Sequence, residues 1–193
     1  MVTSLNRVVC VVAILNAAYF AVEFGVALHI GSVSLFADSI DFLEDTSINV
    51  LILVALAWNA RARARVGMAL AGILLVPGLA TLGMAWHKFM LPVSPAPGPL
   101  TATGVGALAV NLSCAFLLAR FRHHGGSLSR AAFLSARNDT LANVAIMLAG
   151  AVTALYPSIW PDLVVGLGIA ALNADAARDV FAAARQEHVE ARP

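Results

Sequence analysis

Six long apolar stretches, separated by short polar gaps, limit what this chain can fold into. A transmembrane helix requires about 20 mostly apolar residues, and each stretch reaches that length. Only 12% of the residues are charged and 60% are hydrophobic, whereas about a quarter of the residues in a soluble domain are charged. We therefore predict an all-α membrane protein, a single domain of six transmembrane helices that span residues 8–30, 33–58, 66–90, 100–121, 131–156 and 163–184.

Turn-forming residues mark the gaps between these spans. Gly31-Ser32 predicts a very tight first turn, and residues 92–99 form a proline-rich loop. Residues 123–127 and 157–161 contain the glycines and prolines that interrupt helices. The residues after the last span, 185–193, are too few for a folded domain, so we expect no C-terminal soluble domain.

The arginines predict the orientation in the membrane. They precede the first span, fill the loop after the second span, flank the loop after the fourth, and lie at the C-terminal end: Arg7, Arg61, Arg63, Arg65, Arg120, Arg122, Arg130, Arg178, Arg185 and Arg192. The opposite loops contribute only Lys88. Because basic residues remain on the cytoplasmic side, both termini are predicted to be cytoplasmic, as an even number of spans requires. We expect a multi-pass protein, and the brevity of the chain favours a bacterial-type inner membrane.

Seven acidic residues lie within the predicted spans: Glu23, Asp38, Asp41, Glu44, Asp45, Asp139 and Asp175. An Asp at the centre of a membrane helix costs about 2.5–3.5 kcal/mol on insertion scales. These side chains must therefore face the interior of the bundle or a water-filled cavity. A structural hydrogen bond between helices is an alternative role for Glu23 and Asp175. Asp38 lies close to the start of its helix and is interpreted as a capping or packing residue in preference to a ligand.

The second span carries most of these acidic residues on one face. At about 100° per residue, one narrow stripe contains Ser34, Asp38, Asp41, Asp45 and Asn49, with Glu44 at its edge. Asp41 and Asp45 are one turn apart, so their carboxylates can share a cation. In a low dielectric the same pair would otherwise repel and hold a proton. The pair is therefore a candidate site at which a divalent ion and protons compete.

The fifth span repeats this pattern with Ser135, Asn138, Asp139, Ala142 and Asn143 on one face. If the two polar stripes meet, Asp41, Asp45 and Asp139 supply three carboxylates, and Ser135 or Asn138 supplies a further oxygen. Such an oxygen-rich set suits a divalent metal ion. We expect Asn16 and Glu23 to support the cavity. The residues expected either to support the site or to take part in proton exchange are Glu23, Asp38, Glu44, Asn138 and Asn143. The two cysteines, Cys10 and Cys114, are interpreted as small core residues.

The run from Asn16 to Asp45 reads Asn-x6-Glu-x7-Gly-Ser-x-Ser-Leu-x-Ala-Asp-x-x-Asp-x-x-x-Asp and resembles the first two helices of cation diffusion facilitators. Asp41 and Asp45 match the two metal-ligand positions there, which are His or Asp and then Asp. The fifth helix of that family carries His-x-x-x-Asp, and Ser135 and Asp139 fall on this pattern. Residues 162–166, Asp-Leu-Val-Val-Gly, are similar to the start of the family's sixth helix.

The resemblance implies efflux of a divalent transition metal by metal/proton antiport with alternating access, with no cofactor beyond the transported ion. Family frequency favours Zn²⁺ or Cd²⁺, whereas a site without His or Cys favours Mn²⁺, Fe²⁺ or Co²⁺; zinc is our default. Three features depart from the family pattern: Ser135 replaces the histidine, a C-terminal domain is not expected, and the histidine-rich loop shrinks to His123-His124.

The expected partners are metal ions, protons and the lipid bilayer. The resemblance also suggests a homodimer, which the small residues Gly67, Ala71, Gly78 and Gly83 would favour as readily as packing within one bundle. A net charge of +1 without a basic cluster gives no indication of nucleic-acid binding.

Two other functions remain to be weighed. A proton-coupled carrier of a small organic cation would use the carboxylates only as proton sites. An intramembrane aspartyl protease is disfavoured because its Tyr-Asp and Gly-x-Gly-Asp motifs do not occur in the sequence.

Overall fold

A computed structural model describes residues 2–55, 78–119 and 126–190. The side chains of residues 2–5, 54–55, 126–138 and most of 176–190 are not among those described. The helices are α1 (Val2–Ile30), α2 (Val33–Ala55), α4 (Pro97–Ala119), α5 (Gly126–Leu155) and α6 (Trp160–Glu190). Residues 78–90 form a further helical segment, and these described ranges contain no strand.

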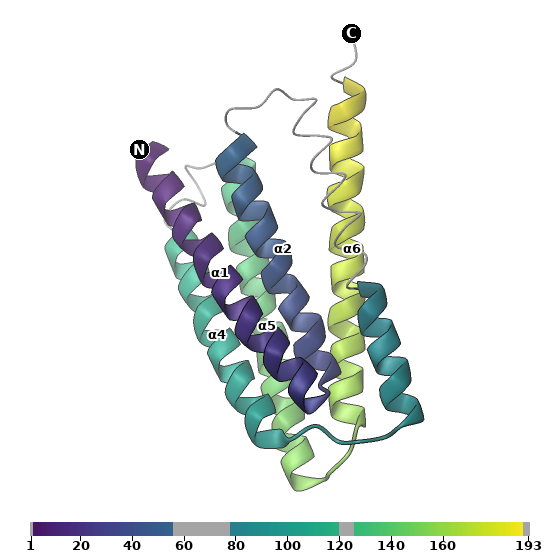
Figure 1. Cartoon of the computed structure of the whole chain (residues 1–193). Helices are drawn as coiled ribbons and strands as arrows, with labels where there is room; N and C mark the ends of the chain where they lie inside the picture. The colour runs from purple at the N-terminus through teal and green to yellow at the C-terminus, as the bar shows by residue number, and fades with distance from the viewer. Residues whose placement is uncertain (1, 56–77, 120–125, 191–193) are drawn as a thin grey trace.

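The helices lie side by side along one common direction (Figure 1). Helix α1 packs against α2 and α4, and α4 packs against α5. Helix α6 lies against both α2 and α5. The segment 78–90 lies beside the beginning of α6, where Phe89 contacts the ring of Trp160. The two chain ends lie at the same end of the bundle (Figure 1).

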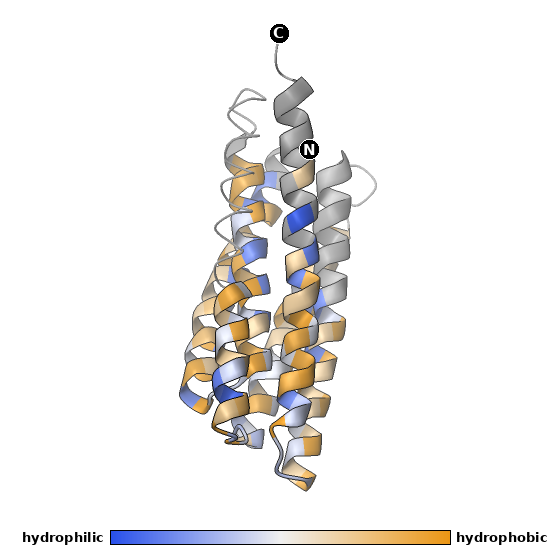
Figure 2. Cartoon of the chain, turned by 90° about the vertical axis from the view of Figure 1, so that its right-hand side faces the viewer, coloured by the Kyte–Doolittle hydropathy of each residue, from blue (hydrophilic) through white to orange (hydrophobic). Residues whose placement is uncertain are grey.

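The distribution of polar residues is the reverse of that in a soluble protein. Asn16, Glu23, Asp38 and Asn143 are fully buried, at 0% exposed. Large apolar side chains point outward instead, for example Phe116 at 79% exposed. Figure 2 shows hydrophobic residues along most of the described length of the helices, interrupted by hydrophilic ones. An exterior this apolar over a polar interior is suited to lipid.

By length and composition alone, two of the described helices could cross a membrane, over Asn6–Ile30 and Pro97–Ala119. A shorter apolar helix covers Asp139–Leu155. Helix α2 is less apolar because it carries four of the acidic residues, Asp38, Asp41, Glu44 and Asp45.

The tight first turn is confirmed, since α1 ends at Ile30, α2 begins at Val33, and Gly31 has a φ of 63°. The proline-rich loop is shorter than predicted: α4 begins at Pro97, because proline is well accommodated in the first turn of a helix. Helices α5 and α6 also begin earlier than predicted, at Gly126 and Trp160. Residues 66–77 of the third span, the arginines between residues 61 and 65, and His123-His124 lie outside the described residues.

A buried ion pair joins the segment 78–90 to α6, and its carboxylate also binds the beginning of α2. Lys88 Nζ lies 2.7 Å from Asp162 Oδ2 and donates a second hydrogen bond of 2.6 Å to the carbonyl oxygen of Gly31. The backbone N–H groups of Val33 and Ser34 also donate to Asp162, at 2.9 and 3.1 Å. The hydroxyls of Ser32 and Ser34 complete the set, at 2.7 and 2.6 Å. We call these residues the Asp162 cluster: Gly31, Ser32, Val33, Ser34, Lys88 and Asp162.

The Asp162 carboxylate satisfies the free N–H groups at the start of α2 and lies at the positive end of the helix dipole. Burial raises the pKa of Asp162, but the Lys88 ammonium and the serine hydroxyls outweigh this effect and hold the pKa below its ordinary value. The pair therefore stabilises the fold above the ordinary carboxyl pKa, and this contribution is lost only as the pH falls through the lowered value.

Replacement of Lys88 by Met tests the ion pair. It leaves the Asp162 charge buried without its cation, and breaking such a pair costs about 3–5 kcal/mol. We expect a clearly lower midpoint of thermal unfolding for the purified protein in detergent. His87→Met, at the adjacent exposed position, is the matched control and should leave the midpoint nearly unchanged. Equal midpoints for the two variants would contradict the role of the pair.

Gly166 lets α6 approach the first turn of α2. A Cβ atom at this position would lie 2.7 Å from both Ser34 N and Val33 C, which are backbone atoms that cannot move aside cheaply. Gly168, two residues later on the same helix, has no described atom within 4 Å of the corresponding position. Asp162 and Gly166, one helical turn apart on α6, thus act on the same part of α2. Asp162 caps the helix, and Gly166 allows its backbone to approach α6 closely.

These two glycines provide a matched pair of variants. Gly166→Ala should destabilise the protein by about 1–3 kcal/mol, the usual cost of overpacking. Gly168→Ala should be neutral or slightly stabilising, because alanine favours the helix. The measurement is thermal unfolding in detergent, and a Gly166→Ala variant as stable as Gly168→Ala would show that α6 does not approach α2 this closely.

Candidate metal-binding pocket

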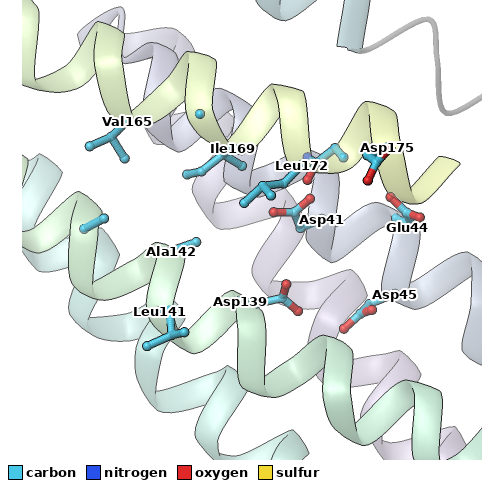
Figure 3. A pocket seen from close by; sticks show the side chains of 13 residues that line it. Asp41, Glu44, Asp45, Asp139, Leu141, Ala142, Val165, Ile169, Leu172 and Asp175 are labelled. Carbon is cyan, nitrogen blue, oxygen red and sulfur yellow. The ribbon is translucent and has the colours of Figure 1, made fainter. Parts of the chain in front are cut away.

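A pocket of about 650 Å³ lies between α2, α5 and α6. Five acidic residues line it together, as Figure 3 shows: Asp41, Glu44, Asp45, Asp139 and Asp175. The remaining wall is mostly apolar and comes from α5 and α6, including Leu141, Ile169 and Leu172. Among the described residues that line the pocket there is no Lys, Arg or His.

Helix periodicity accounts for the acidic wall. Asp41, Glu44 and Asp45 are spaced i, i+3 and i+4 on α2, so they share one face of that helix. Asp139 reaches the same pocket from α5. The second and fifth helices therefore meet along their polar stripes. Glu44, predicted at the edge of its stripe, is part of the pocket wall.

Burial makes this concentration of negative charge costly. Asp45 and Glu44 are 7% and 8% exposed, and Asp41 and Asp139 are partly buried. Carboxylates this close in a low dielectric repel one another unless a cation or protons neutralise them. The described part of the lining contributes no basic side chain, so within this part of the chain bound cations or protons are left to neutralise the carboxylates.

A chain of hydrogen bonds orients Asp45 from behind. Asn16 on α1 donates from Nδ2 to Asp45 Oδ2 at 3.3 Å, and the Cys114 thiol on α4 donates to Asn16 Oδ1 at 3.5 Å. Asn16 thus contacts a residue of the pocket wall, as expected of a residue that supports the cavity. Cys114 is buried, as expected for a core residue, and its contact with Asn16 was not predicted. The prediction for Cys10 was wrong: its side chain is exposed on the outer, apolar side of α1.

Asp38 lies on the predicted stripe but does not line the pocket. Its Oδ2 accepts a hydrogen bond of 2.6 Å from Asn143 Nδ2, and Asn143 Oδ1 accepts one of 3.0 Å from Asn111. Both Asp38 and Asn143 are fully buried between the helices. Asp38 thus joins α2 to α5, in agreement with its interpretation as a packing residue. Ser34, also on the stripe, binds Asp162 instead.

For two predicted oxygen donors, the structure shows only the helix to which they belong. Ser135 and Asn138 belong to α5, in the turn that precedes Asp139, and their side chains lie outside the described residues. Among the side chains that are described, no three His, Cys, Asp or Glu are grouped closely enough to hold one metal ion. The pocket is spacious, since a water molecule occupies about 30 Å³ in the liquid. It has room for a cation with its hydration shell.

The profile of the cation efflux transmembrane domain matches residues 9–187. The chain belongs to the cation efflux family. It is therefore a membrane protein of a family that transports metal cations, and it is not classed as an enzyme. A comparison with curated proteins found no match.

Membership of the cation efflux family confirms the resemblance to cation diffusion facilitators. The match extends across the predicted metal-ligand positions on α2 and α5 and across Asp162 and Gly166. It argues against the aspartyl protease, because this family comprises transporters. In the sequence Asp162 stands out only as part of a family motif; its ion pair with Lys88 was missed because the two residues are 74 positions apart.

The Asn16 contact can be tested by substitution. Asn16→Ala removes a donor from a buried carboxylate, and hydrogen bonds to charged groups contribute about 1.5–3 kcal/mol. We expect a corresponding loss of stability in thermal unfolding. Asn49→Ala is the control: the Asn49 amide donates to the backbone of its own helix, at the Asp45 carbonyl, and its Oδ1 has no partner among the described residues. A larger loss for Asn49→Ala than for Asn16→Ala would contradict this account.

Proposed function

We propose that this member of the cation efflux family exports a divalent transition-metal ion in exchange for protons. Asp41, Asp45 and Asp139 are the proposed ligands, and Ser135 or Asn138 supplies a further oxygen. One observation carries the proposal: three carboxylates from two helices line a single pocket whose described lining has no basic residue. An unneutralised wall of this kind binds cations, and the charge favours a divalent one.

The donor set bears on the choice of metal. Carboxylate and hydroxyl or amide oxygens suit Mn²⁺, Fe²⁺ and Co²⁺, whereas zinc sites usually include His or Cys. The family resemblance favours Zn²⁺ and Cd²⁺, and we retain Zn²⁺ as the default cargo. Because no three described carboxyl or imidazole groups are grouped around one point, tight coordination requires Ser135, Asn138 or water, or a closer approach of α2 and α5.

The exchange follows from competition for the same oxygens. Ionised Asp41, Asp45 and Asp139 bind the metal ion, and protonation of these groups on the other side of the membrane releases it. Asn16 holds Asp45 in position throughout. Helix α6 contributes the apolar wall of the pocket, and a change in its packing against α2 and α5 would expose the carboxylates to alternate sides of the membrane.

The arginine distribution supports an inner-membrane protein with cytoplasmic termini. The location of both chain ends at one end of the bundle agrees with this orientation (Figure 1). A homodimer is what the family resemblance implies, and the small residues Gly78 and Gly83 would favour close helix contact within it. Gly67 and Ala71 lie outside the described residues.

A proton-coupled carrier of a small organic cation is the second candidate. The observation that favours it is the apolar part of the wall, where Leu141, Ile169 and Leu172 face the carboxylates across about 650 Å³. Sites for small organic molecules typically have volumes of about 300–1,000 Å³ and mostly apolar linings.

Transport in sealed proteoliposomes under an imposed pH gradient tests the proposal. Zn²⁺, Cd²⁺, Co²⁺ and Mn²⁺ are supplied in turn to the wild type and to Asp45→Ala. We expect gradient-driven uptake of at least one metal and its reduction by at least tenfold in the variant, because a ligand and a charge are lost. Ser113→Ala, on the exposed face of α4, is the control and should transport like the wild type.

Wild-type transport by Asp45→Ala would overturn the ligand assignment. Uptake of a tetraalkylammonium ion, with no uptake of any metal, would favour the organic-cation carrier instead.

A further inference from the structure

A second pair of carboxyl groups lies in the bundle, apart from the metal pocket. Glu23 on α1 and Asp38 on α2 are both 0% exposed, and neither lines the pocket. Their side chains are close enough to hydrogen-bond to each other when one is protonated. The proposed metal site makes no use of either residue.

Without a bound proton, this pair of carboxyl groups lacks hydrogen-bond donors. Asp38 Oδ2 accepts from Asn143. Asp38 Oδ1 and both side-chain oxygens of Glu23 receive no donor from the described residues. Buried polar atoms without a partner are rare and call for an explanation. A proton on Glu23 supplies one: the resulting O–H can donate to Asp38 Oδ1, and a single proton then serves both carboxyl groups.

The charged and titratable groups around Glu23 point to the same conclusion. Tyr19 on its own helix and Asp38 and Asp41 on α2 interact with it electrostatically. Helices α2 and α4, which pack against α1, contain no Lys, Arg or His over their described lengths. The one titratable residue of α4, Cys114, bonds to Asn16. From α5, Asn143 bonds Asp38, and Asp139 faces the pocket. With no cation among these groups, two adjacent buried carboxylates cannot both be ionised.

We propose that Glu23 is a proton-binding site of this transporter, separate from the metal ligands, and that it shares its proton with Asp38. The inference rests on the proposed metal/proton exchange for its role, but not for the presence of the proton. Asp41 connects the two sites, because it lines the pocket and also interacts electrostatically with Glu23. A divalent cation bound at Asp41 offsets negative charge near Glu23 and favours release of its proton. Metal and proton are then alternative occupants, as antiport requires.

Infrared spectroscopy of the full chain in lipid tests for the proton directly. The wild type at neutral pH should show the carbonyl stretching band of an un-ionised carboxylic acid, shifted in D₂O. Glu23→Gln should reduce this band, while its amide can still donate to Asp38 Oδ1 and preserve the packing. Glu187→Gln, which changes a carboxyl in the charged segment after the predicted last span, is the matched control and should leave the band unchanged. Absence of the band in the wild type, or its full retention in Glu23→Gln, would overturn the proposal.

Proteoliposomes test the role of this proton in coupling. With Zn²⁺ as the probe, Glu23→Gln should bind the metal within about threefold of the wild-type affinity but exchange fewer protons per metal ion, with a shallower pH dependence of uptake. An unchanged ratio and pH profile would overturn the role in coupling. Failure of the wild type to transport any metal would contradict the proposed function instead, and the infrared band would still decide whether Glu23 holds a proton.

Discussion

The cost of placing polar atoms against hydrocarbon determines how this chain is arranged. An ionisable side chain that faces lipid is expensive, so the acidic and amide residues turn inward, and the exterior consists of large apolar residues such as Phe116 and Leu148. Among the described residues, the interior then holds more carboxyl groups than basic groups that could neutralise them. The single buried cation among the described residues, Lys88, is committed to Asp162. The remaining carboxyl groups can be stabilised only by protons, amide donors or a cation from outside.

Helix α2 carries most of these carboxyl groups and contacts every other labelled helix. Its first turn is bound by Asp162 of α6, and its middle faces Glu23 of α1 and Asn143 of α5. One turn further along, Asp41, Glu44 and Asp45 face the pocket. A single helix thus carries a fixed end, a buried carboxyl pair and the proposed metal ligands in succession. Because these groups lie within a few turns of one helix, a change in the charge of one alters the electrostatic environment of the others.

Much of this arrangement could be predicted from the sequence, since helical periodicity put Asp41 and Asp45 on one face of the second span and Asp139 on a polar face of the fifth. The three side chains line one pocket in the structure. The tight turn at Gly31 followed in the same way from local chemistry. The partners of Asp162 and Asp38 could not be predicted, because their contacts join residues more than 70 positions apart. Asp38 shares its stripe with Asp41, yet the packing of α1 and α5 closes over it. Cys10 was assigned to the core because an apolar residue within a membrane span gives no indication of which side faces lipid.

The anchoring of α2 at one end has a mechanical consequence. Asp45 lies 12 residues beyond Val33, which at 1.5 Å per residue is a lever of about 18 Å. A tilt of α2 by about 5° around the Asp162 cluster would therefore displace Asp45 by roughly 1.6 Å. That distance is larger than the difference between a hydrogen-bonded contact of about 2.8 Å and a metal–oxygen bond of about 2.1 Å. A helix held at one end in this way can make or break coordination at its middle through a rotation small enough to leave its own backbone intact.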